Sequence, residues 1–199
     1  MARCARLRIA IFSWRNWIVI WALVTSGAAG SAQSFDFSAA ELISKFDLQL
    51  KADGGDVTKE CKKTGRDTKC TFVDAGFQKS VAALKKLDLA NGRFDLKASL
   101  LVSEEKGKVF LIIVTGNRGD PMNLFHFIGQ FGSLLMAINP KLSTDEYTKE
   151  VSTLGLMRGD AAPDIGEPKT DILDFAEIQC NNQHTKKSSS IGCVLRPRF

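Results

Sequence analysis

Hydrophobic and polar residues alternate in some stretches of the chain and recur at helical spacing in others. From Phe94 to Val102 every second residue is apolar, which is the period of a strand with one buried face. A polar turn, Ser103 to Lys108, then precedes an uninterrupted apolar run from Val109 to Thr115. Because a run rich in β-branched residues is typical of a central strand, we expect these two strands to pair as a hairpin.

Capping residues predict helices at two places. The segment Ser-Ala-Ala-Glu at 38–41 has the capping-box pattern, so we expect a helix to begin at Ala39 and to end near Phe46 or Leu48. A second capping box, Ser-Thr-Asp-Glu at 143–146, opens another helix, which Gly155 ends.

Weaker patterns predict the remaining elements. Apolar residues between Asp74 and Leu87 share one face at helical spacing, which indicates a helix. Near the C-terminus we expect two strands, at about 172–181 and 191–196. Together these elements predict an α+β fold in which helices pack on one face of an antiparallel sheet built from hairpins.

The longest uncharged stretch, PMNLFHFIGQFGSLLMAINP, runs from Pro121 to Pro140 and follows Asp120, a suitable helix N-cap. Its polar residues, spaced three and four apart, fall within an arc of about 80°, and most apolar residues cover about 200° on the other side. This stripe consists of Asn123, His126, Gln130 and Ser133. We therefore expect an amphipathic helix whose broad face packs on the sheet and whose stripe is partly covered by a neighbouring helix.

Two membrane alternatives suit this segment less well. A transmembrane span would not segregate its polar residues on one side, and a membrane-surface helix usually carries Lys or Arg on its polar face. A functional alternative is that its phenylalanines and glycines line a groove for an apolar ligand or a partner protein. The candidate residues for such a surface are Phe125, His126, Phe127, Gly129, Phe131 and Gly132.

The first 32 residues have the pattern of a secretory signal peptide. Four arginines precede an apolar run from Trp17 to Val24, and small residues at Gly30 and Ala32 suit a cleavage site. The run is shorter than the 18 or more residues expected of a span, so an uncleaved anchor is the weaker interpretation. We expect cleavage near Ala32, a periplasmic or secreted location, and one α+β domain over residues 33–199.

The charge balance changes once this segment is set aside. Removing its four arginines from the 27 Lys and Arg leaves 23, against 22 Asp and Glu. A nucleic-acid-binding protein needs a basic surface, and this balance gives no overall support for one. The local cluster of Lys59, Lys62, Lys63, Arg66 and Lys69 is typical of a sheet edge protected from aggregation by lysines.

Four cysteines lie beyond residue 32, and an even number in an exported chain predicts two disulfides. Cys61 and Cys70 are centred on Gly65-Arg66, which suits a type II′ hairpin turn, and Cys180 and Cys193 flank a polar turn-like segment. We predict the pairs Cys61–Cys70 and Cys180–Cys193. A zinc site that also uses His184 is an alternative, but these spacings match no common zinc motif.

Few residues suit catalysis or metal binding. Neither histidine lies in a catalytic motif, and we expect His126 to be part of the packed stripe. Two Arg-Gly-Asp tripeptides, at 118–120 and 158–160, coincide with predicted helix ends, which explains them without adhesion. An acidic loop with Asp160, Asp164, Glu167 and Asp171 lacks the spacing of a calcium-binding EF-hand. We expect no cofactor and no resident metal.

The sequence therefore favours an exported, noncatalytic binding or inhibitory module whose partner is another exported protein. A carrier of a small apolar ligand that uses the phenylalanine-rich helix at 121–138 is the alternative, and an enzyme is the third hypothesis. We expect no nucleic-acid partner and no membrane span after residue 32.

Overall fold

The computed structural model describes residues 33–53, 55–86, 97–118, 121–156, 168–184 and 189–198. The chain separates into the units Met1–Ser31 and Ala32–Phe199, and every described residue belongs to the second. The predicted signal segment lies outside the described residues, as do Asp120 and the tripeptide at 158–160.

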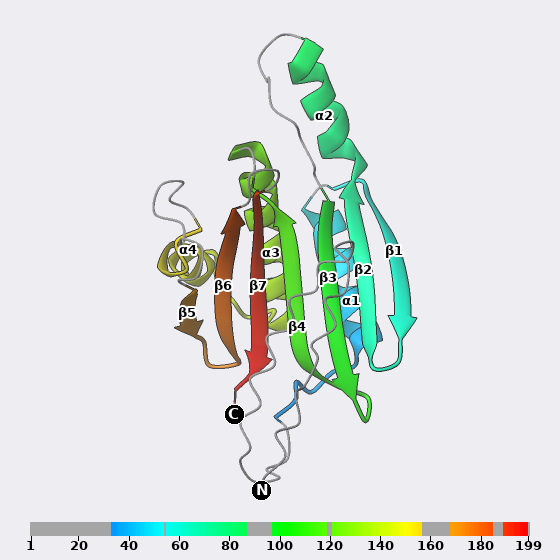
Figure 1. Cartoon of the computed structure of the whole chain (residues 1–199), viewed down its shortest axis with the longest axis vertical. Coiled ribbons are helices and arrows are strands. Elements are labelled where there is room, and N and C mark those ends of the chain that lie inside the picture. The colour runs from blue at the N-terminus through cyan, green and yellow to red at the C-terminus, as the bar shows by residue number, and fades with distance from the viewer. Residues whose placement is uncertain are drawn as a thin grey trace, which may run out of the picture. The chain divides into compact units, whose positions relative to one another are not determined.

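Four helices and seven strands make up the described part of the chain. The helices are α1 (Ala39–Ala52), α2 (Ala75–Lys86), α3 (Pro121–Ile138) and α4 (Thr144–Thr153). The strands are β1 (Val57–Thr64), β2 (Asp67–Asp74), β3 (Lys97–Glu105), β4 (Lys108–Asn117), β5 (Lys169–Ile172), β6 (Ala176–His184) and β7 (Ser189–Pro197). All seven strands pair in one antiparallel sheet in the order β1-β2-β3-β4-β7-β6-β5 (Figure 1). The predicted fold class is confirmed.

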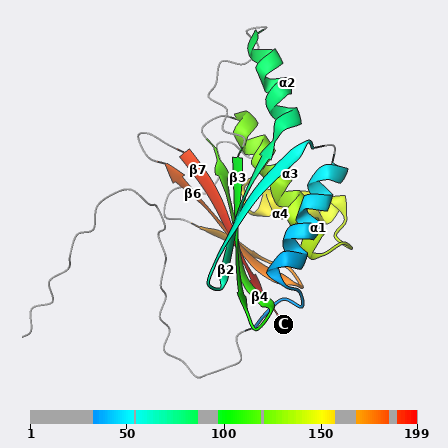
Figure 2. The same cartoon turned by 90° about the vertical axis from the view of Figure 1, so that its right-hand side faces the viewer.

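Helices cover one face of this sheet. Figures 1 and 2 show α1, α3 and α4 on the same side, where α1 contacts β1 and β3, α3 contacts β4, and α4 contacts β5. We call this side the inner face and the opposite side the outer face. The helix α2 continues from the end of β2 and extends beyond the sheet (Figure 1).

Glycine sets the backbone of both tight hairpins. The β1–β2 turn has a positive φ of 60° at Gly65, its first central residue, in agreement with the predicted type II′ turn. In the β3–β4 turn both central residues have positive φ, 53° at Lys106 and 78° at Gly107, as a type I′ turn requires.

Both predicted disulfides are present. Cys61 lies directly opposite Cys70 across β1 and β2, and Cys180 lies directly opposite Cys193 across β6 and β7. The Cα atoms are 4.1 Å apart in each pair. Each bridge therefore staples one hairpin rather than joining distant parts of the sheet.

The core lies between the sheet and the helices, and it follows from the alternation in the strands. In β3, for example, Ala98, Leu100 and Val102 point inward and are buried, whereas Lys97 and Leu101 are not. Large aromatic side chains fill the space between the layers. Among the described residues, the fully buried phenylalanines are Phe46, Phe72, Phe127 and Phe131.

The polar stripe of α3 is covered, as the sequence predicts. Asn123, Gln130 and Ser133 are each no more than 3% exposed, and α1 packs along α3. The Ser133 hydroxyl donates a 2.6 Å hydrogen bond to Asp53 Oδ2, just after α1. A buried serine paired in this way fixes how the two helices meet.

Two predicted boundaries were wrong. The first helix runs to Ala52, because Leu50 is buried and extends the apolar face by another turn. The strand expected at about 172–181 is divided into β5 and β6 by a turn in which Leu173 N donates to Ala176 O at 2.8 Å. That turn contains neither Gly nor Pro, so no local signal marked it.

Candidate functional site: the outer face of the sheet

The phenylalanine-rich surface predicted on α3 does not form as one surface. Phe127 and Phe131 are 1% and 0% exposed and belong to the core. Gly116 on β4 leaves room for Phe127, since a Cβ there would lie 2.6 Å from its ring. The space beside Gly132 is filled by Tyr147 of α4, whose ring would lie 2.7 Å from an added Cβ. The chain's own side chains thus occupy the expected groove.

The other three candidate residues lie nearer the surface of α3. Phe125 is 68% exposed, and Gly129 has open space beside it. His126 is half-buried and stacks on Phe77 of α2, with ring centroids 5.0 Å apart. Its Nε2 also lies 2.9 Å from Gln130 Nε2. These contacts give His126 a packing role between α2 and α3.

Tyr147 also has a structural explanation. Its hydroxyl donates a 2.6 Å hydrogen bond to the Ile128 carbonyl of α3. Burial, with a smaller contribution from the negative charge of Asp53, raises the pKa of Tyr147 to about 12. The phenol therefore stays neutral and acts as a hydrogen-bond donor between α3 and α4.

Two lysines of the basic cluster are bound to acids on the inner side of the sheet. Lys59 donates to Asp47 Oδ2 of α1 at 2.8 Å, and Lys51 donates to the same atom at 3.0 Å. Burial favours a raised pKa for Asp47, but the two lysine hydrogen bonds outweigh it and hold the pKa below its ordinary value. Lys63 pairs with Glu104 in the same way.

Glu104 also stabilises the start of α1. Its Oε2 accepts a 3.0 Å hydrogen bond from Ala39 N, the first helical residue. The hydrogen bond from Lys63, and then the one from Ala39, lower the pKa of Glu104. Lys59 and Lys63 thus connect the edge strand to the helical layer, and this role explains their position without a nucleic-acid partner.

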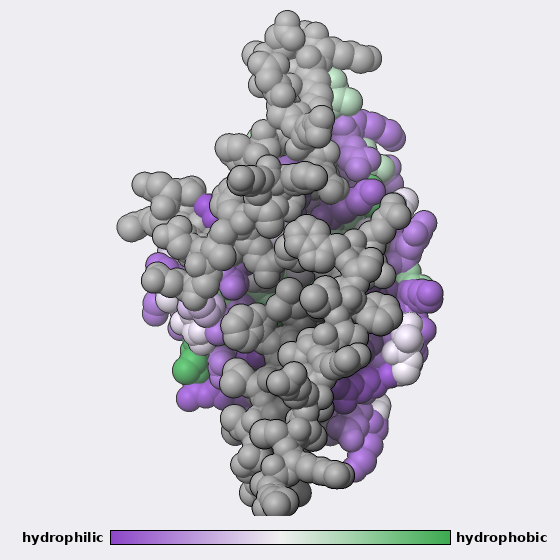
Figure 3. All heavy atoms as spheres, in the orientation of Figure 1, coloured by the Kyte–Doolittle hydropathy of each residue, from purple (hydrophilic) through white to green (hydrophobic). Residues whose placement is uncertain are grey.

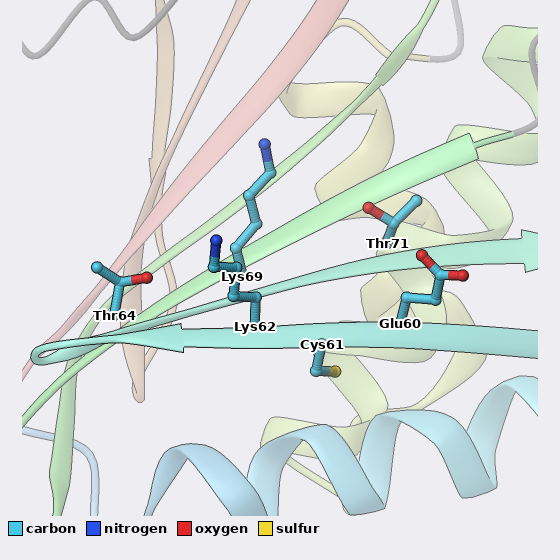
Figure 4. Close-up of a pocket in the computed structure, with 6 residues that line it drawn as sticks. All are labelled: Glu60, Cys61, Lys62, Thr64, Lys69 and Thr71. Carbon is cyan, nitrogen blue, oxygen red and sulfur yellow. The ribbon is translucent and has the colours of Figure 1, made fainter.

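The remaining hairpin lysines lie on the outer face. Lys62 and Lys69 are directly opposite each other across β1 and β2. Figure 4 shows both pointing away from α1, whereas Cys61 points toward it. Neither lysine has an acidic or hydrogen-bonding partner within the described residues.

These lysines border a shallow, open depression on the hairpin. Glu60, Thr64 and Thr71 line it beside them, with Cys61 below (Figure 4). Most of the described side chains along the β1–β2 side of the molecule are hydrophilic (Figure 3). Charged and hydroxyl-bearing side chains predominate around this depression, and its two ammonium groups suit an anionic ligand.

Next to the lysines, the centre of the outer face is apolar. Leu101 on β3, Ile113 on β4 and Val194 on β7 are direct cross-strand neighbours. All three are half-buried and lie outside the hydrophobic core. We call these three residues the apolar row. No described helix or strand covers it (Figure 2).

The pairing of the strands joins the row to polar residues at both ends. Lys69 on β2 is the cross-strand neighbour of Leu101, and Gln179 on β6 is the neighbour of Val194. At about 4.8 Å per strand, the three apolar residues span roughly 10 Å. The outer face therefore presents a short apolar strip that begins at the unpaired lysines.

A perturbed carboxyl pair lies elsewhere in the fold. Glu150 of α4 is 2% exposed and is hydrogen-bonded to Asp171 of β5. Burial, and then the charge of Asp171, raise the pKa of Glu150 to about 7. Asp171 is the only described member of the predicted acidic loop. This pair is distant in sequence from His126, which stacks on Phe77 of α2.

Metal binding and membrane spanning find no support among the described residues. They contain no group of three or more His, Cys, Asp or Glu side chains arranged to hold a metal ion. Within the same ranges, no helix is long and apolar enough to cross a membrane.

Comparisons with known proteins found no matching family model, no matching curated protein and no matching solved structure.

Proposed function

We propose that this protein is an exported, noncatalytic binding module that docks a partner protein on the outer face of its sheet. The observation that carries the proposal is the apolar row, Leu101, Ile113 and Val194, in register on three strands and uncovered by any described element. Three aligned aliphatic side chains on one face of a sheet offer a contact that a protein partner can bury.

The export part of the proposal has two supports. The first 32 residues have the charge and apolar pattern of a signal peptide. Both pairs of cysteines beyond them form disulfides, which persist in oxidising compartments such as the periplasm and the extracellular space.

The carrier alternative loses its best support, because Phe127 and Phe131 fill the core instead of lining a cavity. An enzyme has less support still, since His126 is engaged by Phe77 and Gln130. Native mass spectrometry of protein purified from its own source checks the carrier directly. A retained lipid mass would favour the carrier over the binding module.

Site-specific photo-crosslinking tests the proposal. A benzophenone amino acid is placed at Ile113 on the outer face, and in a control at Leu48, which is 64% exposed on α1. Both proteins are expressed in the source organism and irradiated. We expect a discrete protein adduct from position 113 and none from position 48. Adducts of equal yield at both positions, or none at 113, would refute docking on the outer face.

A second variant separates binding from folding. Ile113→Glu places a charge in the middle of the apolar row but leaves the core untouched, because Ile113 points away from it. We expect an unchanged far-ultraviolet circular dichroism spectrum and loss of the partner. Retention of the partner by this variant would contradict the proposal.

A further inference from the structure

The lysines of the β1–β2 hairpin are divided between two environments. Lys59 and Lys63 have carboxylate partners on the inner side. Lys62 and Lys69, on the outer side, face each other across the strands and have no partner among the described residues. Like charges directly opposite each other destabilise a sheet. An anionic group placed between the two ammonium groups would remove that repulsion.

No described carboxylate lies within ion-pair distance of Lys62 or Lys69. On the same face, Arg196 lies 3.9 Å from Glu177, and the Asp67 carboxylate accepts a 2.7 Å hydrogen bond from Ser103. Glu60 lies on the same face as Lys62, two residues along β1, but forms no ion pair with it. Within the described residues, Lys62 and Lys69 therefore have no carboxylate at ion-pair distance, although Glu60 and Asp67 lie on the same face.

Register connects these charges to the apolar row. Lys69 is the direct neighbour of Leu101, which is followed by Ile113 on the next strand. A ligand that spans the strands thus meets ammonium groups first and aliphatic side chains next. The complementary surface carries carboxylates beside apolar side chains.

This arrangement disfavours two other occupants. A second copy docked face to face with its apolar row running in the same direction would bring its own Lys62 and Lys69 toward positive charge, which is unfavourable. A nucleic acid would leave the apolar row without a matching partner, because its backbone is charged throughout.

We propose that the partner presents an acidic segment, with its carboxylates on Lys62 and Lys69 and its apolar side chains on Leu101, Ile113 and Val194. This inference rests on the proposed docking function and specifies the chemistry of the partner. Lys62 and Lys69 set the orientation of the bound partner and make its binding depend on salt, and the apolar row supplies the area that binding buries.

The test uses the crosslink from position 113 as its readout. The test variant carries both Lys62→Glu and Lys69→Glu. The control variant carries both Lys79→Glu and Lys141→Glu, which make the same change in net charge at exposed positions away from the outer face. We expect the first double variant to lose the adduct by about tenfold or more, because two favourable charge contacts become repulsive. The second double variant should keep it.

Defined probes complete the experiment. Poly-glutamate should reduce the yield of the adduct formed from position 113 when Lys62 and Lys69 are unchanged, and poly-lysine should not reduce it. An adduct that survives the Lys62 and Lys69 reversals would overturn the acidic partner while leaving docking at Ile113 intact. If the protein with Lys62 and Lys69 unchanged formed no adduct, both the acidic partner and docking on the outer face would be overturned. Flotation with phosphatidylglycerol vesicles that depended on Lys62 and Lys69 would assign the lysines to lipid headgroups and overturn the acidic-protein inference.

Discussion

The carboxyl groups of Glu150 on α4 and Asp171 on β5 are hydrogen-bonded to each other at the inner side of the sheet edge. Glu150 is almost fully buried, and its Oε1 has no hydrogen-bond partner within the described structure. The charge of Lys149 lowers the pKa of Glu150, but this effect is weaker than the rise caused by burial and by Asp171. Burial and the charge of Asp171 therefore favour the protonated form of the Glu150 carboxyl, which can donate to Asp171.

This pair predicts that the protein loses stability as the pH rises from about 4.5 to about 7. The pKa of Glu150 is about 7 in the folded state, against 4.5 as its ordinary value. A raised pKa contributes stability that is fully present below 4.5 and is lost between 4.5 and about 7. We expect a loss on the order of 2–3 kcal/mol in the free energy of unfolding. Urea unfolding followed by circular dichroism at pH 5 and pH 8 measures it.

Glu150→Gln is the matched variant, because an amide keeps a hydrogen-bond donor toward Asp171 and does not titrate. We expect its stability to vary less between pH 5 and pH 8 and to exceed that of the native chain at pH 8. Glu105→Gln, in the exposed β3–β4 turn, serves as the control for loss of one carboxylate. If the Glu150 and Glu105 variants had the same pH dependence, the raised pKa of Glu150 would be contradicted.

Alanine substitutions at two glycines of α3 should change the stability of the protein in opposite directions. Gly132→Ala places a Cβ 2.7 Å from the Tyr147 ring, so we expect a loss of about 1–3 kcal/mol from overpacking. Gly129→Ala meets nothing within 4 Å, so the better helix propensity of alanine should stabilise the protein by about 0.5–1 kcal/mol. Thermal unfolding of both variants checks this. Similar shifts of the two melting temperatures would contradict the Tyr147 contact.

The two disulfides should differ in their resistance to reduction. Cys61 is exposed on the edge strand, whereas Cys180 and Cys193 are fully buried. Under native conditions a limiting reductant should open Cys61–Cys70 first, and alkylation with mass spectrometry identifies the bridge that opens. Replacing either bridge with alanines should cost about 3 kcal/mol in the chain-entropy model. Earlier reduction of Cys180–Cys193 would be inconsistent with its burial in the sheet.

The ion pair between Lys59 and Asp47 should be measurable and pH-dependent. Asp47 has a lowered pKa, so its contribution is present above the ordinary value of 3.8 and is lost as the pH falls through the folded-state pKa. A double-mutant cycle with Asp47→Asn and Lys59→Met should give a coupling energy of about 1 kcal/mol at pH 7. The coupling should vanish near pH 2. A coupling that is unchanged in acid would show that packing, not charge, links these residues.

Local patterns in the sequence were sufficient for several elements. The capping residues Ser38 and Ser143 each accept a hydrogen bond from the backbone N–H three residues later, as predicted. The hairpin turn at Gly65 brings Cys61 opposite Cys70. These features depend on residues close together in the chain, so their physical cause is visible in the sequence.

Other features depend on contacts between distant segments. The turn that separates β5 from β6 has no Gly or Pro and forms where β6 pairs with both β5 and β7. The buried position of Glu150 likewise depends on β5, because Asp171 is provided by that strand. No periodicity in the sequence encodes either relationship.

The sequence alone determined the class of fold, the two disulfide pairs and the amphipathic character of the 121–138 helix, because each follows from spacing along one or two neighbouring elements. Only the tertiary structure decided that Phe127 and Phe131 are core while Phe125 is exposed. It also decided that Lys59 is paired while Lys62 has no partner among the described residues. The apolar row arises in the same way, since β3, β4 and β7 become neighbours through long-range pairing. Burial and charge pairing are properties of the space around a side chain, and that space is assembled by segments far apart in the chain.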